Sequence, residues 1–112
     1  YPTTGMPHPR LYGTFARVLE RYVGSVLTLT EAVHKMTLAP AQALRLHGKG
    51  KIAAGYDADL VIFDPQAVHE NGTYENPACF ASGIETVFVG GVPALLDGRC
   101  TGANSGCVLR RD

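Results

Sequence analysis

The segment Gly50-Lys-Ile-Ala-Ala-Gly-Tyr-Asp-Ala-Asp-Leu-Val-Ile-Phe-Asp64 carries the clearest structural pattern of the chain. Gly50 and Gly55 permit positive φ angles, which suits sharp changes of direction within a few residues. The carboxylates of Asp57 and Asp59 can accept hydrogen bonds from nearby backbone N–H groups and hold a turn. The unbroken apolar run at 60–63 is typical of a strand that is buried on both faces. The segment therefore predicts a turn, an acidic corner and a buried strand.

Two further strands are expected downstream of this segment. Residues 84–89 and 92–96 are rich in branched side chains. The Gly90-Gly91 pair between them favours a two-residue hairpin turn, because both turn positions need positive φ. Pro93 has no N–H to donate to a ladder, so we expect it at a sheet edge or at a non-bonded position.

The part of the chain before Gly48 has a helical pattern instead. Pro9 suits the first turn of a helix that ends at Gly24-Ser25. Thr30 is the predicted N-cap of a second helix, and Pro40 is the predicted start of a short third one. In the first helix, apolar residues recur at steps of three and four with charged residues on the other face: Leu11, Phe15, Val18, Leu19 and Tyr22, against Arg17, Glu20 and Arg21.

Together these patterns predict an α+β chain with two parts, 1–48 with the helices and 49–112 with the strands. Residues 66–83 are expected to form a long excursion, and the tail from Gly98 is expected to be mostly irregular. Three strands do not close a sheet, so the sheet needs a partner at its edges. That partner is either another part of a longer chain or another molecule.

Composition excludes several classes of function. The chain has 112 residues, and its 10 basic and 10 acidic residues cancel. We therefore expect no nucleic-acid partner, because the chain has no accumulated positive charge to bind phosphates. We expect no membrane partner either, because no apolar stretch is long enough to span a bilayer. Cys79, Cys100 and Cys107 have neither disulfide-framework nor metal-knuckle spacing, which indicates a reduced, cytoplasmic protein. The first residues show no initiator Met and no helix or strand pattern, as in the interior of a longer chain.

The segment Pro7-His8-Pro9-Arg10-Leu11-Tyr12-Gly13-Thr14-Phe15 is the best candidate for a binding role. Its prolines make a rigid loop that presents an imidazole and a guanidinium just before a helix. The planar donor fork of Arg10 suits a carboxylate. A structural alternative is that Arg10 pairs with a nearby acid and that His8 caps the helix. Both interpretations stay open at this point.

No metal site or catalytic group is predicted from residue spacing. The four histidines, His8, His34, His47 and His69, lack the spacing of metal ligands, and no cysteine lies close to them in sequence. The chain has neither a nucleophile elbow nor a phosphate-binding glycine loop. Asp57, Asp59 and Asp64 are expected to be structural, because Asp is a common turn residue.

Two motifs resemble known families. The string G-K-I-A-x-G-x-D-A-D-L-V-I-F-D at 50–64 closely resembles the C-terminal segment of the metal-dependent amidohydrolases. The string H-P-R-L-Y-G-T-F at 8–15, followed by Met36-Thr37 and Pro40-Ala41, resembles the N-acyl-D-amino-acid deacylases (D-aminoacylases) of that superfamily. The resemblance covers nearly the whole chain. It implies that the helices belong to the end of a TIM-type barrel and the strands to the C-terminal part of a small β-sandwich.

The resemblance also implies a function. It implies hydrolysis of N-acyl-D-amino acids to a carboxylate and a D-amino acid, with zinc as the cofactor of the parent enzyme and the remainder of the amidohydrolase chain as partner. Arg10 would hold the α-carboxylate of the substrate, with Tyr12 and His8 lining the same mouth. The metal ligands and the general base of the family match no residue here, so the isolated chain should be inactive.

Two alternatives remain. A dihydroorotase- or hydantoinase-like cyclic amidohydrolase would share the 50–64 string without needing the motif at 8–15. A non-catalytic assembly domain would use its unpaired strands to dock onto a partner chain.

Overall fold

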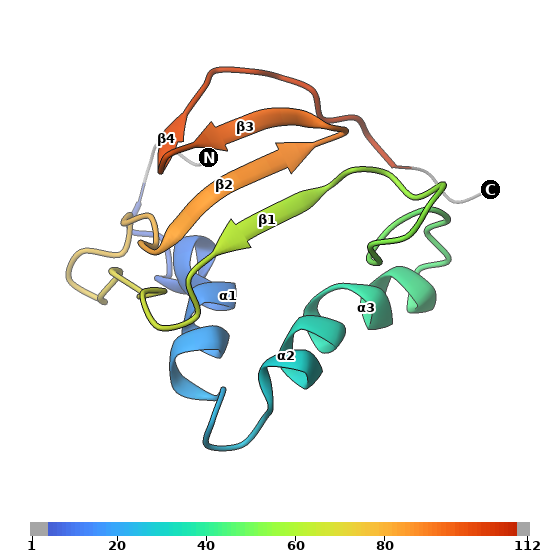
Figure 1. The fold of residues 1–112 in the computed structure, drawn as a ribbon. Helices are drawn as coiled ribbons and strands as arrows, with labels where there is room; N and C mark the ends of the chain where they lie inside the picture. The colour runs from blue at the N-terminus through green and yellow to red at the C-terminus, as the bar shows by residue number, and fades with distance from the viewer. Residues whose placement is uncertain (1–4, 110–112) are drawn as a thin grey trace.

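The structure, a computed structural model, describes residues 5–109. Figure 1 shows an antiparallel sheet lying above a layer of helices, with α2 and α3 in succession beneath it. The predicted α+β class is confirmed, as are the three helices and the three strand segments. The elements, in chain order, are α1 (Arg10–Arg21), α2 (Leu29–Met36), α3 (Leu38–Ala43), β1 (Leu60–Phe63), β2 (Ile84–Val89), β3 (Val92–Leu96) and β4 (Arg99–Cys100).

The sheet is a simple meander in the order β1-β2-β3-β4, with every neighbouring pair antiparallel. Gly90 and Gly91 have φ angles of 58° and 80°, as the predicted two-residue turn requires. Pro93 lies opposite Phe88, where the register between β2 and β3 shifts, and outside the part of β3 that pairs with β4. A missing N–H is tolerated there, so the prediction of a non-bonded position is confirmed.

The expectation of a mostly irregular tail is confirmed, although the described tail begins with a short strand that the sequence did not predict. Asp97 and Gly98, with φ angles of 49° and 70°, make a second two-residue turn that leads into β4. Asp-Gly is a strong hairpin signal, because both residues tolerate positive φ. The remainder of the described tail, 101–109, contains no helix or strand.

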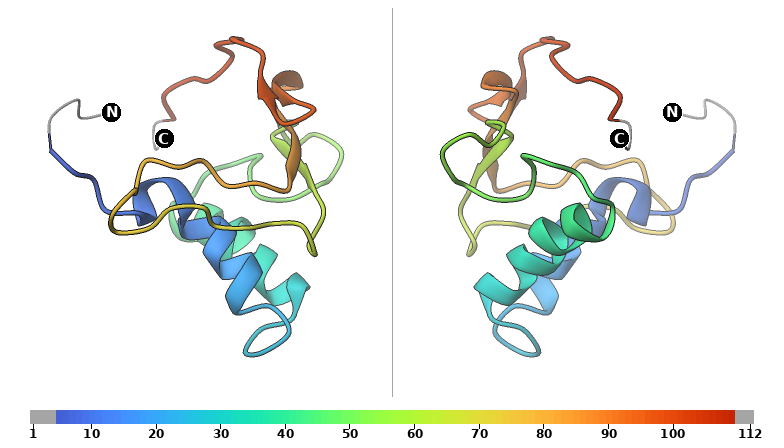
Figure 2. Two further views of the ribbon diagram at one scale, coloured as in Figure 1. Left: turned by 90° about the vertical axis from the view of Figure 1, so that its left-hand side faces the viewer. Right: turned by 90° about the vertical axis from the view of Figure 1, so that its right-hand side faces the viewer.

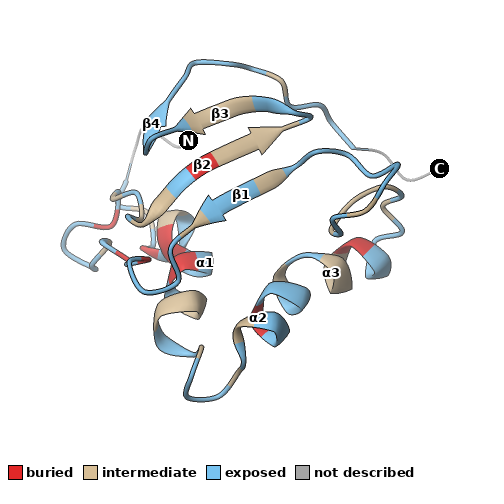
Figure 3. Ribbon diagram, viewed as in Figure 1, coloured by how far each residue is buried: buried red, intermediate tan, exposed pale blue. Residues whose placement is uncertain are grey.

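The prediction that β1 is buried on both faces is wrong for the described residues. Val61 and Ile62 are 53% and 49% exposed, and Figure 3 shows the exposed stretch of β1 in blue. The reason is that no described helix covers either face of β1, which also lies at the edge of the sheet. No helix residue lies within 8 Å, Cα to Cα, of a strand residue.

Helix α1 packs with the face that the sequence predicts to be solvated. Its buried residues are Gly13 and Ala16, and its charged side chains meet the excursion at 66–83. Figure 2 shows this excursion passing alongside α1 in both views. The apolar stripe of the helix is left open, with Phe15 64% exposed. Ion pairs and hydrogen bonds therefore attach α1 to the rest of the described chain.

Two helix starts differ from the prediction. The N-cap of α2 is Thr28 rather than Thr30, because Thr28 and Glu31 form a capping box. The Thr28 Oγ1 accepts the Glu31 N–H at 3.2 Å, and the Glu31 carboxylate accepts the Thr28 N–H at 2.8 Å. The Thr28 N–H, followed by the Thr28 hydroxyl, which donates to the same carboxylate at 2.7 Å, lowers the pKa of Glu31. Helix α3 begins at Leu38, with Pro40 inside the first turn, where the helix needs no N–H donor.

The described residues bury little apolar volume. The buried apolar side chains are small: Ala16, Ala32, Ala41 and Val68. No helix of the described part is long and apolar enough to span a bilayer.

Candidate functional site

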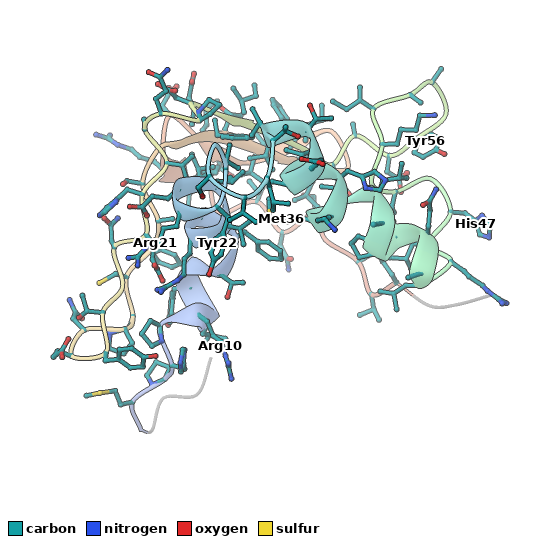
Figure 4. All side chains as sticks on the ribbon, turned by 90° about the horizontal axis from the view of Figure 1, so that it is seen from below. Arg10, Arg21, Tyr22, Met36, His47 and Tyr56 are labelled. Atoms are coloured by element: carbon teal, nitrogen blue, oxygen red, sulfur yellow. The ribbon has the colours of Figure 1, made fainter. Side chains whose placement is uncertain are left out.

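The start of α1 presents the strongest candidate for binding. Pro9 is the N-cap, so Arg10 is the first residue of the helix. Figure 4 shows Arg10 projecting from this end of α1, far from His47 and Tyr56. Its guanidinium makes no hydrogen bond or ion pair with any residue from 5 to 109. The alternative in which Arg10 pairs with a nearby acid is therefore not met within these residues.

His8 caps the helix, as the structural alternative predicts. Its Nδ1 accepts the backbone N–H of Arg10 at 3.1 Å. A backbone N–H can only donate, so a neutral imidazole here carries its proton on Nε2. Nε2 faces the Tyr74 hydroxyl at 3.4 Å, with the two rings edge to face at 5.2 Å. His8 thus joins the excursion at 66–83 to the first residue of α1.

Tyr12 makes a second aromatic contact to the same excursion. Its ring packs edge to face against Phe80, with centroids 5.5 Å apart. Both Tyr74 and Phe80 are largely exposed. The structure therefore brings together the three residues predicted to form the site, His8, Arg10 and Tyr12, at one end of α1, and it adds Tyr74 and Phe80. Sequence reasoning missed these two, although aromatic residues in a polar excursion were an available signal.

The body of α1 is held by a buried carboxylate. The Glu70 side chain is 2% exposed, and its Oε2 lies 3.0 Å from Arg17 Nη1 and 3.7 Å from Arg21 Nη2. Gly13 makes room for it, because a Cβ at this position would lie 2.8 Å from Glu70 Cγ. The helix needs glycine here to let the carboxylate approach its surface.

Glu20 completes the attachment of α1. One carboxylate oxygen accepts the Glu70 N–H at 2.9 Å, and the other lies 2.8 Å from His69 Nδ1. The Glu70 N–H, followed by His69, lowers the pKa of Glu20. His69 in turn exchanges backbone hydrogen bonds with Ser82 at 3.1 and 3.0 Å. This end of the helix is fully committed to internal contacts.

The acidic corner is structural, as predicted. Lys49 Nζ lies 2.9 Å from Asp57 Oδ2 and 2.5 Å from Asp59 Oδ2, and Asp59 Oδ1 accepts the Gly90 N–H at 2.8 Å. Lys49, and then the Gly90 N–H, lower the pKa of Asp59, while the two carboxylates raise the pKa of Lys49. Asp64 accepts the backbone N–H two residues on, at 2.9 Å. All three aspartates are therefore engaged by groups of this chain.

A metal ion does not fit the side chains of the described residues. No three His, Cys, Asp or Glu side chains of residues 5–109 are grouped closely enough to hold one. His34 and His47 are exposed and isolated from such a group, and the three cysteines are free thiols.

Comparisons with known proteins show the family of this chain. Residues 4–94 match the profile described as "Amidohydrolase family". D-aminoacylase of Alcaligenes xylosoxydans xylosoxydans is 45% identical over 112 residues, which are 98% of this chain and 23% of that protein. A crystal structure of D-aminoacylase, described as defining a novel subset of amidohydrolases, matches with a TM-score of 0.89 at 44% identity, over 95% of this chain and 23% of that one.

A third match is a deacylase with a bound ligand. N-acyl-D-glutamate deacylase from Bordetella bronchiseptica, solved with zinc and a phosphonate inhibitor that mimics the tetrahedral intermediate, matches with a TM-score of 0.78 at 40% identity. That match covers 85% of this chain and 21% of the deacylase. The chain therefore spans less than a quarter of the length of these relatives. The predicted resemblance is confirmed, and this chain belongs to the amidohydrolase family.

Proposed function

We propose that this chain is the C-terminal part of an N-acyl-D-amino-acid deacylase, which hydrolyses its substrate to a carboxylate and a free D-amino acid. The observation that carries the proposal is the Arg10 guanidinium, which has no hydrogen bond or ion pair within residues 5–109 and lies at a helix start in a chain 45% identical to D-aminoacylase. The helices would belong to the end of a barrel and the sheet to a small β-sandwich. The open apolar faces of α1 and β1 suit such surroundings.

Arg10 is proposed to bind the α-carboxylate of the substrate. A guanidinium can donate two parallel hydrogen bonds to a carboxylate, which fixes orientation as well as supplying charge. No internal ion pair within residues 5–109 must break before this contact forms. His8 and Tyr12 would line the same mouth through their ring edges. The contribution of Arg10 is orientation of the scissile amide rather than bond chemistry.

The bond chemistry is assigned to other parts of the enzyme. Zinc is proposed as the cofactor of the whole protein, because the Bordetella bronchiseptica relative was solved with it. No side chain of residues 5–109 is assigned to the metal, and Asp57, Asp59 and Asp64 are already committed. The chain alone is therefore proposed to be inactive. A cytoplasmic location is proposed from its three free thiols.

The test is release of D-methionine from N-acetyl-D-methionine by the full-length protein with zinc present. Arg10→Ala is expected to raise KM about 10- to 100-fold with a smaller change in kcat, which corresponds to losing one charge-assisted contact of about 1.5–3 kcal/mol. Arg45→Ala is the matched control, because Arg45 is also an exposed arginine without an ion pair in the described part. It should leave both constants unchanged.

Three results would contradict the proposal in different ways. An unchanged KM in Arg10→Ala would remove the carboxylate role of Arg10. Opening of cyclic amides without cleavage of N-acyl-D-amino acids would favour a dihydroorotase- or hydantoinase-like enzyme. A full-length protein that hydrolyses neither class would favour the assembly domain.

A further inference from the structure

A continuous chain of contacts leads from the excursion at 66–83 to the backbone of Arg10. The Tyr74 hydroxyl lies 3.4 Å from His8 Nε2, and His8 Nδ1 accepts the Arg10 N–H at 3.1 Å. Tyr74 and His8 are 66 positions apart in sequence. The imidazole uses both ring nitrogens, one toward each partner. Its orientation is therefore restrained from two sides.

We propose that Tyr74 is a positioning residue for the substrate carboxylate. Through His8 it fixes the first residue of α1, and with it the direction in which the Arg10 side chain leaves the helix. This inference rests on the proposed function, since it takes Arg10 as the group that binds the carboxylate. In this proposal Tyr74 acts on the substrate carboxylate through His8 and Arg10.

The backbone on both sides of this contact is restrained. His8 stands between Pro7 and Pro9, and a residue that precedes proline is confined to extended conformations. The prolines thus restrict the main chain of His8, while Tyr74 and the Arg10 N–H restrict its side chain. The main chain from which the Arg10 side chain leaves is therefore restrained on both sides.

The excursion that carries Tyr74 is itself tied into a fixed shape. The Thr73 N–H donates to the Asn76 carbonyl at 3.1 Å, and the Asn76 N–H donates to Thr73 Oγ1 at 3.0 Å, so Tyr74 lies within a closed turn. Asn71 Nδ2 donates to the Phe80 carbonyl at 2.8 Å, which closes the base of the excursion. Because both the turn and the base of the excursion are closed by hydrogen bonds, the main chain at Tyr74 has a defined position.

The exposure of Tyr74 separates positioning from stability. The residue is 71% exposed, so it buries little apolar area, and an isolated surface side chain contributes little to the free energy of unfolding. Its hydroxyl has His8 as its hydrogen-bond partner within residues 5–109. Removing the ring should therefore disturb the orientation of His8 while α1 stays attached through Glu70.

The test compares Tyr74→Ala and Tyr74→Phe in the full-length protein, with Tyr56→Phe as the control in a different loop. Two substrates are compared. The first is N-acetyl-D-methionine, and the second is the same N-acetylated amine with the α-carboxylate removed. Tyr74→Ala is expected to raise KM about 5- to 10-fold for the first substrate, and Tyr74→Phe about 2- to 3-fold. For the amine, kcat/KM should stay unchanged. The Arg10→Ala/Tyr74→Ala double variant should be no worse than Arg10→Ala alone.

A spectroscopic readout accompanies the kinetics. The imidazole ¹⁵N shifts of His8 should report a proton on Nε2, and they should move in Tyr74→Phe but not in Tyr56→Phe. If Arg10→Ala raises KM while Tyr74→Ala does not, the inference fails and the proposed function survives. If both substrates slow equally in Tyr74→Ala, the residue is merely structural and the inference again fails. Lack of deacylase activity in the unaltered protein overturns both.

Discussion

The two ends of α1 both carry arginines, but one end attaches the helix to the chain and the other is proposed to bind the substrate. Toward its C-terminal end, Arg17 and Arg21 meet the buried Glu70, and Glu20 accepts a backbone N–H. At its start, Arg10 has no ion pair within residues 5–109, and the surrounding contacts come from exposed aromatic edges. A cation that already holds an internal carboxylate cannot bind a ligand without breaking that pair. One helix thus separates the residues that attach it from the residue proposed to bind.

The largest expected effect is at the attached end. Glu70→Ala should lower the opening free energy of α1 by about 2 kcal/mol, because a buried, hydrogen-bonded carboxylate is lost. The loss is below that of a fully buried pair, since Arg17 and Arg21 are about half exposed and can be hydrated. Hydrogen exchange over α1 peptides of the full-length protein measures it. Glu75→Ala, an exposed glutamate in the same excursion, should show no change.

A smaller effect with a change of sign is expected at Gly13. Gly13→Ala should destabilise α1 by about 1 kcal/mol, because the new Cβ forces the Glu70 side chain away and offsets the gain in helix propensity. In the Glu70→Ala background the obstacle is gone, so the same substitution should stabilise α1 by about 1 kcal/mol. Hydrogen exchange of the four members of this cycle decides it. Additive effects would contradict the close contact between helix and carboxylate.

Acid should weaken the attached end further. The folded state lowers the pKa of Glu20 below its ordinary value of 4.5, chiefly through the Glu70 N–H. A lowered folded pKa contributes stability that is present above pH 4.5 and is lost as the pH falls through the folded pKa. Because Glu20 is partly exposed, the contribution is at most about 1 kcal/mol. Protection of α1 between pH 6 and 3 should fall less steeply in Glu20→Gln, and an identical slope would contradict this account.

The smallest effect on stability is expected at the start of the helix. Tyr74→Ala should change the opening free energy of α1 by no more than about 0.5 kcal/mol, because the ring is mostly exposed. The same exchange measurement applies, with Glu70→Ala as the positive control. A loss as large as that of Glu70→Ala would show that both ends of α1 are anchors, and the contrast between them would disappear.

Local signals account for most of the predicted fold. The Gly90-Gly91 turn, the apolar runs of β1 to β3 and the helix that follows Pro9 depend on neighbours in sequence, and all are present. Where two similar signals competed, sequence alone could not decide, as with Thr28 and Thr30. Thr28 is the N-cap because its partner, Glu31, lies three residues on. The Asp97-Gly98 pair is also a local hairpin signal, although no turn is predicted there from the sequence.

Contacts between distant segments account for what the sequence could not supply. The motif at 8–15 was enough to propose Arg10, His8 and Tyr12 as neighbours, since they share one helix start. Nothing local indicated that Glu70 would be buried against Gly13, or that Tyr74 would reach His8. The predicted burial of β1 and of the apolar stripe of α1 failed for a related reason. Both depend on what covers them, and no described residue does.

The separation between helices and sheet determines which substitutions can affect the helices directly. Within residues 5–109 the helices and the sheet are connected through the loops at 44–59 and 64–83, since no helix residue comes within 8 Å, Cα to Cα, of a strand residue. A substitution in the hairpin of β2 and β3 therefore acts first on the neighbouring strands and on the corner at Asp59, not on the helices. A substitution in the loop at 64–83 instead acts directly on α1, because this loop supplies the side chains that bind the helix. Substitutions in that loop should therefore change the position of α1 more than substitutions in the hairpin do.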